Sequence, residues 1–105
     1  MNILIIEDCR IMTFLWKLQA KEAGHITTCC EYKHEALELL RNNNYDLIIL
    51  DNNLNGELGL EIAREIKDIT KTKIIFVLVL LSYMLVGVTD KKVVIKEEKS
   101  ILIKI

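Results

Sequence analysis

Three carboxylates stand where apolar runs of this sequence end. Residues 2–7 form one run that closes on Glu7 and Asp8, and residues 46–50 form another that is followed directly by Asp51. Neither run alternates with polar residues, which is typical of strands buried on both faces of a parallel sheet. Ligands bind at the carboxyl ends of such strands. We therefore expect Glu7, Asp8 and Asp51 to meet at one edge of a sheet.

Such a cluster needs a positive charge. Unpaired carboxylates repel one another and pay a desolvation cost when they are brought together. Mg²⁺ resolves that conflict, because it prefers a few carboxylates together with waters and a phosphate oxygen. Lys96 ends a later predicted strand, where its ammonium group would neutralise a further anion. The residues therefore predict a site for Mg²⁺ and a phosphoryl group.

The elements that must position these residues follow from the spacing of apolar side chains. Strand-like apolar runs alternate along the chain with segments of helical periodicity, and a polar loop covers residues 52–59. Strands are predicted over residues 2–7, 26–30, 46–50, 73–78 and 91–96, and helices over 10–23, 33–43, 60–69 and, as a short one, 97–105. This order predicts an α/β fold, a doubly wound five-stranded parallel sheet of order 2-1-3-4-5 with a shortened or atypical fourth helix.

Two apolar groups bear on packing. The first predicted helix carries four apolar residues that we assign to the core, with the tryptophan partly exposed: Phe14, Leu15, Trp16 and Leu18. Residues 83–86 are too apolar for an exposed short helix, and an exposed patch of that kind marks an interface. We therefore expect a homodimer through the region between the fourth and fifth strands, with segment exchange as one route to it.

Length and charge narrow the classes of function. The chain has 105 residues, of which 51% are hydrophobic, so we expect one domain over residues 1–105 with a real core. Fourteen basic residues against fifteen acidic ones give a net charge of −1. That balance argues against direct binding to nucleic acid, which needs a basic face to neutralise phosphates. The absence of proline is unusual for a globular domain.

No segment has the features of a membrane span or a secretion signal. The longest apolar stretch covers about a dozen residues, well below the roughly 18 that a transmembrane helix needs. The N-terminus lacks the basic start and the longer apolar stretch of a signal peptide. Three cysteines, two of them adjacent, do not form a disulfide framework and fit a reducing compartment. We expect a soluble cytoplasmic protein that does not contact membranes.

The cysteines and histidines offer a second metal site to weigh. His25, Cys29, Cys30 and His34 have a symmetric spacing that invites a zinc interpretation. Adjacent residues of a strand point to opposite faces, so Cys29 and Cys30 cannot easily share one metal. The zinc site is therefore disfavoured. Cys9, which follows the acidic pair, is interpreted as an inert small residue rather than a redox group.

The sequence resembles the receiver domain of two-component response regulators. Residues 3–8 (ILIIED) resemble its first strand and acidic pair, and residues 45–51 (YDLIILD) resemble its third strand and phosphoacceptor. Residues 52–59 resemble the loop that follows, and residues 35–40 (EALELL) resemble its second helix. The resemblance is close over residues 2–78 and weak beyond them. It implies a CheY-like fold and a role in phosphorelay signal transduction.

The resemblance implies a role for each matching residue. Asp51 would take a phosphoryl group from a histidine kinase or a phosphotransfer protein, and Lys96 would pair first with Asp51 and then with the phosphoryl oxygens. Asp8 would bind Mg²⁺ directly, with Glu7 assisting through water, and the backbone carbonyl of Asn53 would be a further ligand. The chain would catalyse its own phosphoryl transfer and dephosphorylation, and no other reaction.

The sequence departs from the family at residues that flank this site. Asn55 and Glu97 stand where the family usually has proline, and a cis bond at Glu97 would cost roughly 2.5–4 kcal/mol. Leu78 and Val79 stand near the usual serine or threonine of the fourth strand, and Ser82 is the nearest hydroxyl. Helix N-cap is the favoured interpretation of Ser82. We infer that phosphoryl uptake persists while the usual conformational switch is altered or lost.

Two other classes of function stay open at this point. A pseudo-receiver would keep the fold and act as a protein-interaction module without using phosphate. A small Mg²⁺-dependent phosphatase-like enzyme is disfavoured, because neither a separate general acid nor a cap domain is visible in the sequence.

Overall fold

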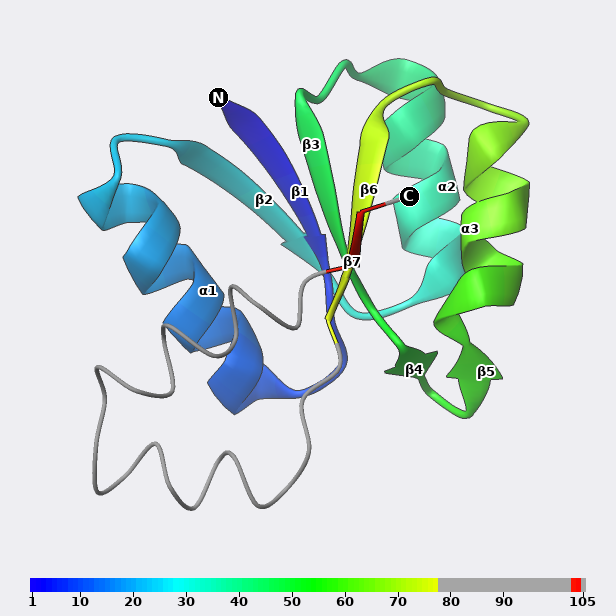
Figure 1. Ribbon diagram of the computed structural model, residues 1–105, viewed down its shortest axis with the longest axis horizontal. Helices are drawn as coiled ribbons and strands as arrows, with labels where there is room; N and C mark the ends of the chain where they lie inside the picture. Colours follow the sequence, from blue (N-terminus) through cyan, green and yellow to red (C-terminus); the bar gives the residue numbers. More distant parts are fainter. Residues whose placement is uncertain (78–102, 105) are drawn as a thin grey trace.

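A computed structural model describes residues 1–77 and 103–104 of the chain (Figure 1). Its strands are β1 (Asn2–Ile6), β2 (Ile26–Cys30), β3 (Leu47–Asp51), β4 (Asn53–Leu54), β5 (Glu57–Leu58), β6 (Lys73–Val77) and β7 (Ile103–Lys104). Its helices are α1 (Arg10–Glu22), α2 (Lys33–Asn42) and α3 (Gly59–Lys67). The predicted alternation of strands and helices is confirmed through β6, with bounds that differ by at most a few residues. No helix in this part of the chain is long and apolar enough to cross a membrane.

The main sheet has the order β2-β1-β3-β6-β7. Within it, β2, β1, β3 and β6 are parallel, and their register pairs Ile6 with Cys30 and Asp51 with Val77. This confirms the predicted order 2-1-3-4 and places β1 beside β3, so that the residues after these two strands lie at the same end of the sheet. The two neighbouring strand ends are the ones that carry the acidic residues.

The prediction of five parallel strands is not confirmed. The strand and the shortened helix predicted within residues 79–96 lie outside the described residues. The helix predicted over residues 97–105 is wrong at its end, because Ile103–Lys104 pairs with β6 as an antiparallel strand. Isoleucine alternates along residues 101–105, and β-branched residues favour strands. An antiparallel edge strand on an otherwise parallel sheet is a common arrangement.

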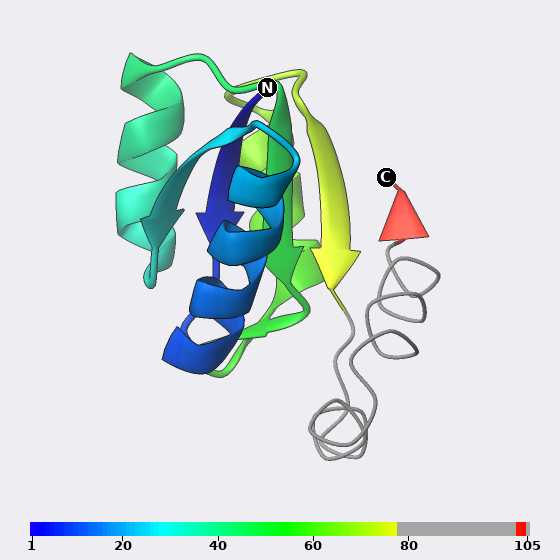
Figure 2. The ribbon, with the colours of Figure 1, turned by 90° about the vertical axis from the view of Figure 1, so that its left-hand side faces the viewer.

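Helices cover both faces of the sheet (Figure 2). One core gathers alternate residues of the strands against α2 and α3: Leu4, Ile6, Ala36, Leu40, Ile48, Leu50, Ile62, Ala63, Ile66, Ile74 and Phe76 are among its members. The other core gathers Ile3, Ile5 and Val77 against Met12, Trp16 and Ala20 of α1. Because successive side chains of a strand point to opposite faces, each apolar run supplies both cores at once.

The packing predicted for α1 is wrong. Met12, Trp16 and Ala20, spaced four residues apart, face the sheet, and Trp16 is buried rather than partly exposed. Phe14 is 63% exposed and Leu18 is 44% exposed, although both were assigned to the core. A helix lying on a sheet buries one stripe, and side chains offset by two residues from that stripe lie on its flank or outer face.

The segment predicted as a polar loop, residues 52–59, contains a hairpin. Strands β4 and β5 pair in antiparallel register across Asn55 and Gly56. Both residues have positive φ, 51° and 87°, which is the conformation of a two-residue type I′ turn. Asparagine and glycine are the residues that accept it. Proline, with φ fixed near −65°, cannot adopt this conformation, so the loop requires a residue other than proline at position 55.

Candidate functional site

Glu7, Asp8 and Asp51 come together at the carboxyl ends of β1 and β3. Each offers a carboxylate oxygen within 4.8 Å of the others, and in Figure 1 this is the end of the sheet toward which the arrows of β1 and β3 point. The convergence predicted from the ends of the apolar runs is confirmed. Within residues 1–77 and 103–104, no other three acidic, histidine or cysteine side chains bring their ligand atoms as close together.

Glu7 is the buried member of the cluster, with only 5% of its surface exposed. Its Oε1 accepts a hydrogen bond from the backbone N–H of Cys9 at 3.0 Å, and its own N–H donates to the Cys30 carbonyl. Burial, followed by repulsion from the Asp51 charge, raises the pKa of Glu7 from 4.5 to about 8. Glu7 therefore holds a proton at neutral pH unless a cation replaces it.

Asp51 is half-buried at the end of β3. Burial is the main reason that its pKa rises from 3.8 to about 6, and the backbone N–H of Asn53, which donates to Oδ1 at 3.2 Å, opposes the rise. Asp8 raises the pKa of Asp51 further, whereas the hydrogen bond with Glu7 lowers it. A carboxylate that accepts a hydrogen bond through one oxygen keeps its second oxygen for another partner.

The cluster fits a hard divalent cation. Its donors are carboxylate oxygens only, which is the ligand type that Mg²⁺ prefers. Both pKa values are raised mainly because burial penalises the charged carboxylates, a cost that nearby positive charge would offset. A divalent cation would supply that charge. The role predicted for the Asn53 carbonyl stays a prediction, since the structure gives only the contact of its N–H group.

The β3–α3 segment is held tightly behind Asp51. The N–H of Asn52 donates to the Val77 carbonyl at 3.2 Å, and the N–H of Gly59 donates to the Asn52 carbonyl at 2.7 Å. A Cβ atom at Gly59 would lie 2.5 Å from the Asp51 carbonyl oxygen and 2.9 Å from the Phe76 ring. Only glycine fits there, so α3 begins directly against the backbone of Asp51.

Asp8 is linked to a second loop through Asn55. Its Oδ2 accepts a hydrogen bond from the backbone N–H of Asn55 at 3.0 Å. The side-chain amide of Asn55 donates in turn to the Glu31 carbonyl, at 2.7 Å, on the connection between β2 and α2. Glu31 also pairs with Arg10 at the start of α1, at 3.4 Å. The β1–α1 connection, the β2–α2 connection and the β4–β5 turn therefore meet around Asp8 at the carboxyl edge of the sheet.

Sequence reasoning did not find the roles of Asn55 and Gly59. The Asn-Gly pair at 55–56 was a usable signal, since this pair is the strongest short-range indication of a hairpin. The contacts of Asn55 span 24 and 47 residues of the sequence. No local pattern indicates contacts over such separations.

Several predicted site residues lie outside the described part of the chain. These are Lys96, Ser82, Leu78, Val79 and Glu97. The argument against a zinc site is confirmed in its geometry: Cys30 packs in the core under α2 and α3, whereas Cys29 packs beneath α1. The backbone alternation of β2 separates them as expected.

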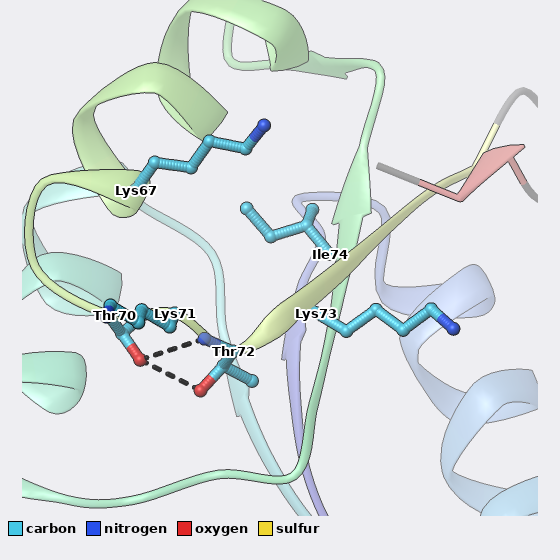
Figure 3. Close-up of a pocket in the computed structure, with 6 residues that line it drawn as sticks. All are labelled: Lys67, Thr70, Lys71, Thr72, Lys73 and Ile74. Atoms are coloured by element: carbon cyan, nitrogen blue, oxygen red, sulfur yellow. Dashed lines mark hydrogen bonds between the residues drawn. The ribbon is translucent and has the colours of Figure 1, made fainter.

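A cavity of about 460 Å³ lies at the other end of the sheet, at the start of β6. It is lined by Lys67, Thr70, Lys71, Thr72, Lys73 and Ile74 (Figure 3). The two threonine hydroxyls bond to each other at 2.8 Å, and Thr72 also donates to the Tyr45 carbonyl. Figure 3 shows the Lys73 side chain extending away from Lys67. The polar groups do not converge on a ligand, so this cavity does not compete with the acidic cluster as the functional site.

Comparison with known proteins gives consistent matches. A family model described as the response regulator receiver domain matches residues 3–82. The response regulator ArlR of Staphylococcus haemolyticus is 38% identical over 77 residues, which cover 72% of this chain and 35% of ArlR. This chain therefore spans about a third of the length of that curated relative.

Two solved structures are similar in both sequence and fold. The response regulator TrrA of Thermotoga maritima, in complex with Mg²⁺–BeF, is 36% identical with a TM-score of 0.69, covering 78% of this chain and 72% of that one. A chain in the crystal structure of histidine kinase ThkA in complex with TrrA is 37% identical, with a TM-score of 0.66, covering 71% of this chain and 66% of that one.

Proposed function

The chain belongs to the response regulator receiver domain family of two-component systems, and from that premise we propose that Asp51 accepts a phosphoryl group from a histidine kinase in a Mg²⁺-dependent reaction. The observation that carries the proposal is the convergence of Glu7, Asp8 and Asp51 at the carboxyl ends of β1 and β3. The similar TrrA protein has been solved with Mg²⁺–BeF and with a histidine kinase, which supports both the cation and the kind of partner.

The three acids have different roles toward the cation because they differ in burial. Asp8 and Asp51, both half-buried, would offer oxygens directly to the cation, and the carbonyl of Asn53 would offer another. Glu7 is deeper and would assist through water after it releases its proton. When bound, Mg²⁺ neutralises charge on the carboxylates and on the incoming phosphoryl oxygens.

Phosphoryl transfer needs little covalent chemistry from the protein. A carboxylate oxygen of Asp51 forms a bond to phosphorus while the bond between phosphorus and the imidazole nitrogen of the donor histidine breaks, and the nitrogen keeps the electron pair. The hydrogen bond from the Asn53 N–H to Oδ1 restrains the Asp51 carboxylate, and Oδ2 is the oxygen that would form the bond to phosphorus. Positioning and charge neutralisation supply the catalysis. The reaction is confined to the chain's own phosphorylation and dephosphorylation, so the chain is not an enzyme acting on other substrates.

Lys96 completes the proposed site as the cation that pairs with Asp51 and then with the phosphoryl oxygens. The proposed homodimer through the region between the fourth and fifth predicted strands rests on the apolar sequence there. A cytoplasmic location agrees with the three free cysteines, Cys9, Cys29 and Cys30.

Intact-mass analysis tests the proposal. The 105-residue chain is incubated with acetyl phosphate, with and without Mg²⁺, and we expect the mass of one phosphoryl group to be added only when Mg²⁺ is present. Asp51→Asn should add none, while Asp68→Asn, at an exposed residue that ends α3, should behave as the wild type. No addition to the wild type, or equal addition to Asp51→Asn, would favour the pseudo-receiver instead.

A further inference from the structure

Asn55 occupies an unusual position beside the acidic cluster. It is the only non-glycine residue with positive φ among the described residues, at 51°, and it makes two hydrogen bonds to parts of the chain far away in sequence. One bond runs from its backbone N–H to a carboxylate oxygen of Asp8, and the other runs from its side-chain amide to the Glu31 carbonyl. A single residue therefore joins the β4–β5 hairpin, Asp8 and the β2–α2 connection.

The hydrogen bond from Asn55 uses one carboxylate oxygen of Asp8 and leaves the other oxygen for a cation. Oδ2 of Asp8 lies 3.0 Å from the Asn55 nitrogen. A carboxylate held through one oxygen loses rotational freedom before a ligand arrives, and a preorganised ligand oxygen binds a cation at lower entropic cost. The donor also carries partial positive charge, which relieves some of the repulsion from Glu7 and Asp51 while the cation is absent.

The hydrogen bond to the Glu31 carbonyl holds the Asn55 backbone N–H in place. At 2.7 Å from Asn55 Nδ2 to the Glu31 carbonyl, it ties the tip of an exposed two-residue turn to the connection across the carboxyl edge of the sheet. The strands of the hairpin are also held by Leu54, which is buried in the core, and by the ion pair of Glu57 with Lys33 at 3.0 Å. The Asn55 amide is the side-chain contact at the turn itself. The side chain of Asn55 therefore holds its own backbone N–H against Asp8.

We propose that Asn55 is a positioning residue for the cation site: its side chain anchors the hairpin to the Glu31 carbonyl, so that its backbone N–H orients the Asp8 carboxylate for Mg²⁺. The inference rests on the proposed function, because it concerns the affinity of the same site for Mg²⁺. It assigns to the hairpin a part in metal binding through Asp8, with no contact between Asn55 and the cation.

The test compares Mg²⁺ affinity in variants of the full chain by isothermal titration calorimetry. Asn55→Gly keeps the positive φ and the backbone N–H and removes only the side-chain anchor. We expect its Kd for Mg²⁺ to rise about threefold to tenfold, which corresponds to the loss of one ordinary hydrogen bond. Asn55→Pro lacks the N–H group and cannot adopt the positive φ of the turn, so it should weaken binding further.

Asn43→Gly is the matched control. It removes an asparagine bond of the same kind, from Nδ2 to the Leu39 carbonyl at 3.0 Å, at the end of α2 and away from the acidic cluster. We expect it to leave the Kd for Mg²⁺ at the wild-type value. The free energy of unfolding without Mg²⁺, measured in urea, is compared for both glycine variants.

A purely structural role would lower the stability of Asn55→Gly and leave its Kd for Mg²⁺ unchanged, and that result would overturn the inference. Equal affinity in Asn55→Gly and the wild type would do so as well, while the proposed function would stand. A wild-type chain that binds no Mg²⁺ would contradict the proposed function itself, and the inference with it.

Discussion

Glu7 is the residue whose environment decides how the free site behaves. It is charged only at a cost, because it is buried and faces Asp51, and its pKa rises to about 8. The folded chain therefore keeps a proton on Glu7 over the range from about pH 4.5 to pH 8, where the unfolded chain has lost it. Because the folded chain then holds more protons than the unfolded chain, the free energy of unfolding falls as pH rises. Asp51, with a pKa raised to about 6, adds to the fall in the lower part of the same range.

We predict that, without Mg²⁺, the free energy of unfolding falls by a few kcal/mol between pH 5 and pH 8, since each unit of pKa shift amounts to about 1.4 kcal/mol. Urea unfolding at several pH values measures it. Glu7→Gln should flatten the upper part of the profile, because an amide of similar shape has no proton to lose.

Glu22→Gln, at an exposed residue that ends α1, should keep the wild-type pH profile. A wild-type stability that is level or rises between pH 5 and pH 8 would show that the charge of Glu7 is compensated in the free protein. Such a result would remove the physical reason for a cation at this site.

The elements that carry the site were predictable to different degrees. The strands β1, β3 and β6 could be located within one or two residues, because long apolar runs have few alternatives to burial in a parallel sheet. The β4–β5 hairpin was not predicted. Two-residue strands have no periodicity, and only Asn55 and Gly56 signalled the turn.

The start of α3 is the element boundary on which Asp51 depends most. A side chain at Gly59 would collide with the Asp51 carbonyl oxygen, at 2.5 Å from its Cβ. We predict that Gly59→Ala destabilises the fold by about 1–3 kcal/mol, the usual cost of overpacking, and also weakens Mg²⁺ binding, because the backbone of Asp51 must move. Urea unfolding and calorimetric titration measure the two effects.

Gly24→Ala provides the comparison. Gly24 has a positive φ of 82° but nothing within 4 Å of an added Cβ, and it lies beyond the end of α1, at the opposite edge of the sheet. It should lose stability through backbone strain alone and keep the wild-type Kd for Mg²⁺. If Gly59→Ala also kept that Kd, the boundary of α3 would not position Asp51.

At the scale of the whole molecule, the layer arrangement followed from the sequence, but the exposure of α1 did not. Helical periodicity indicates one apolar stripe on α1, yet its sequence contains two. The stripe of Met12, Trp16 and Ala20 packs against the sheet, whereas Phe14 of the other stripe is exposed. The edge strand β7 was also missed, because residues 97–105 are predicted as a helix and the pairing with β6 depends on the whole sheet. The site was predictable where it depends on strand ends, and it was not where it depends on contacts between loops.

Binding at the acidic cluster should stabilise the entire fold. A cation that binds only the folded chain adds about 2.7 kcal/mol at a concentration one hundred times its Kd. Because protons compete with it for Glu7 and Asp51, we predict that Mg²⁺ raises the melting temperature more at pH 8 than at pH 5.5. Thermal unfolding followed by circular dichroism measures the difference. An equal rise at both pH values, or the same rise in Asp8→Asn, would contradict binding at this cluster.

The central claim is that Asp51 becomes the acyl phosphate, and locating the modified residue tests it most directly. The chain is treated with acetyl phosphate and Mg²⁺, trapped by borohydride reduction, and digested for peptide mass spectrometry. We predict that reduction marks position 51 alone, and that omitting Mg²⁺ abolishes the mark. A mark on Glu7, Asp8 or another carboxylate, or no Mg²⁺-dependent mark at all, would contradict the account.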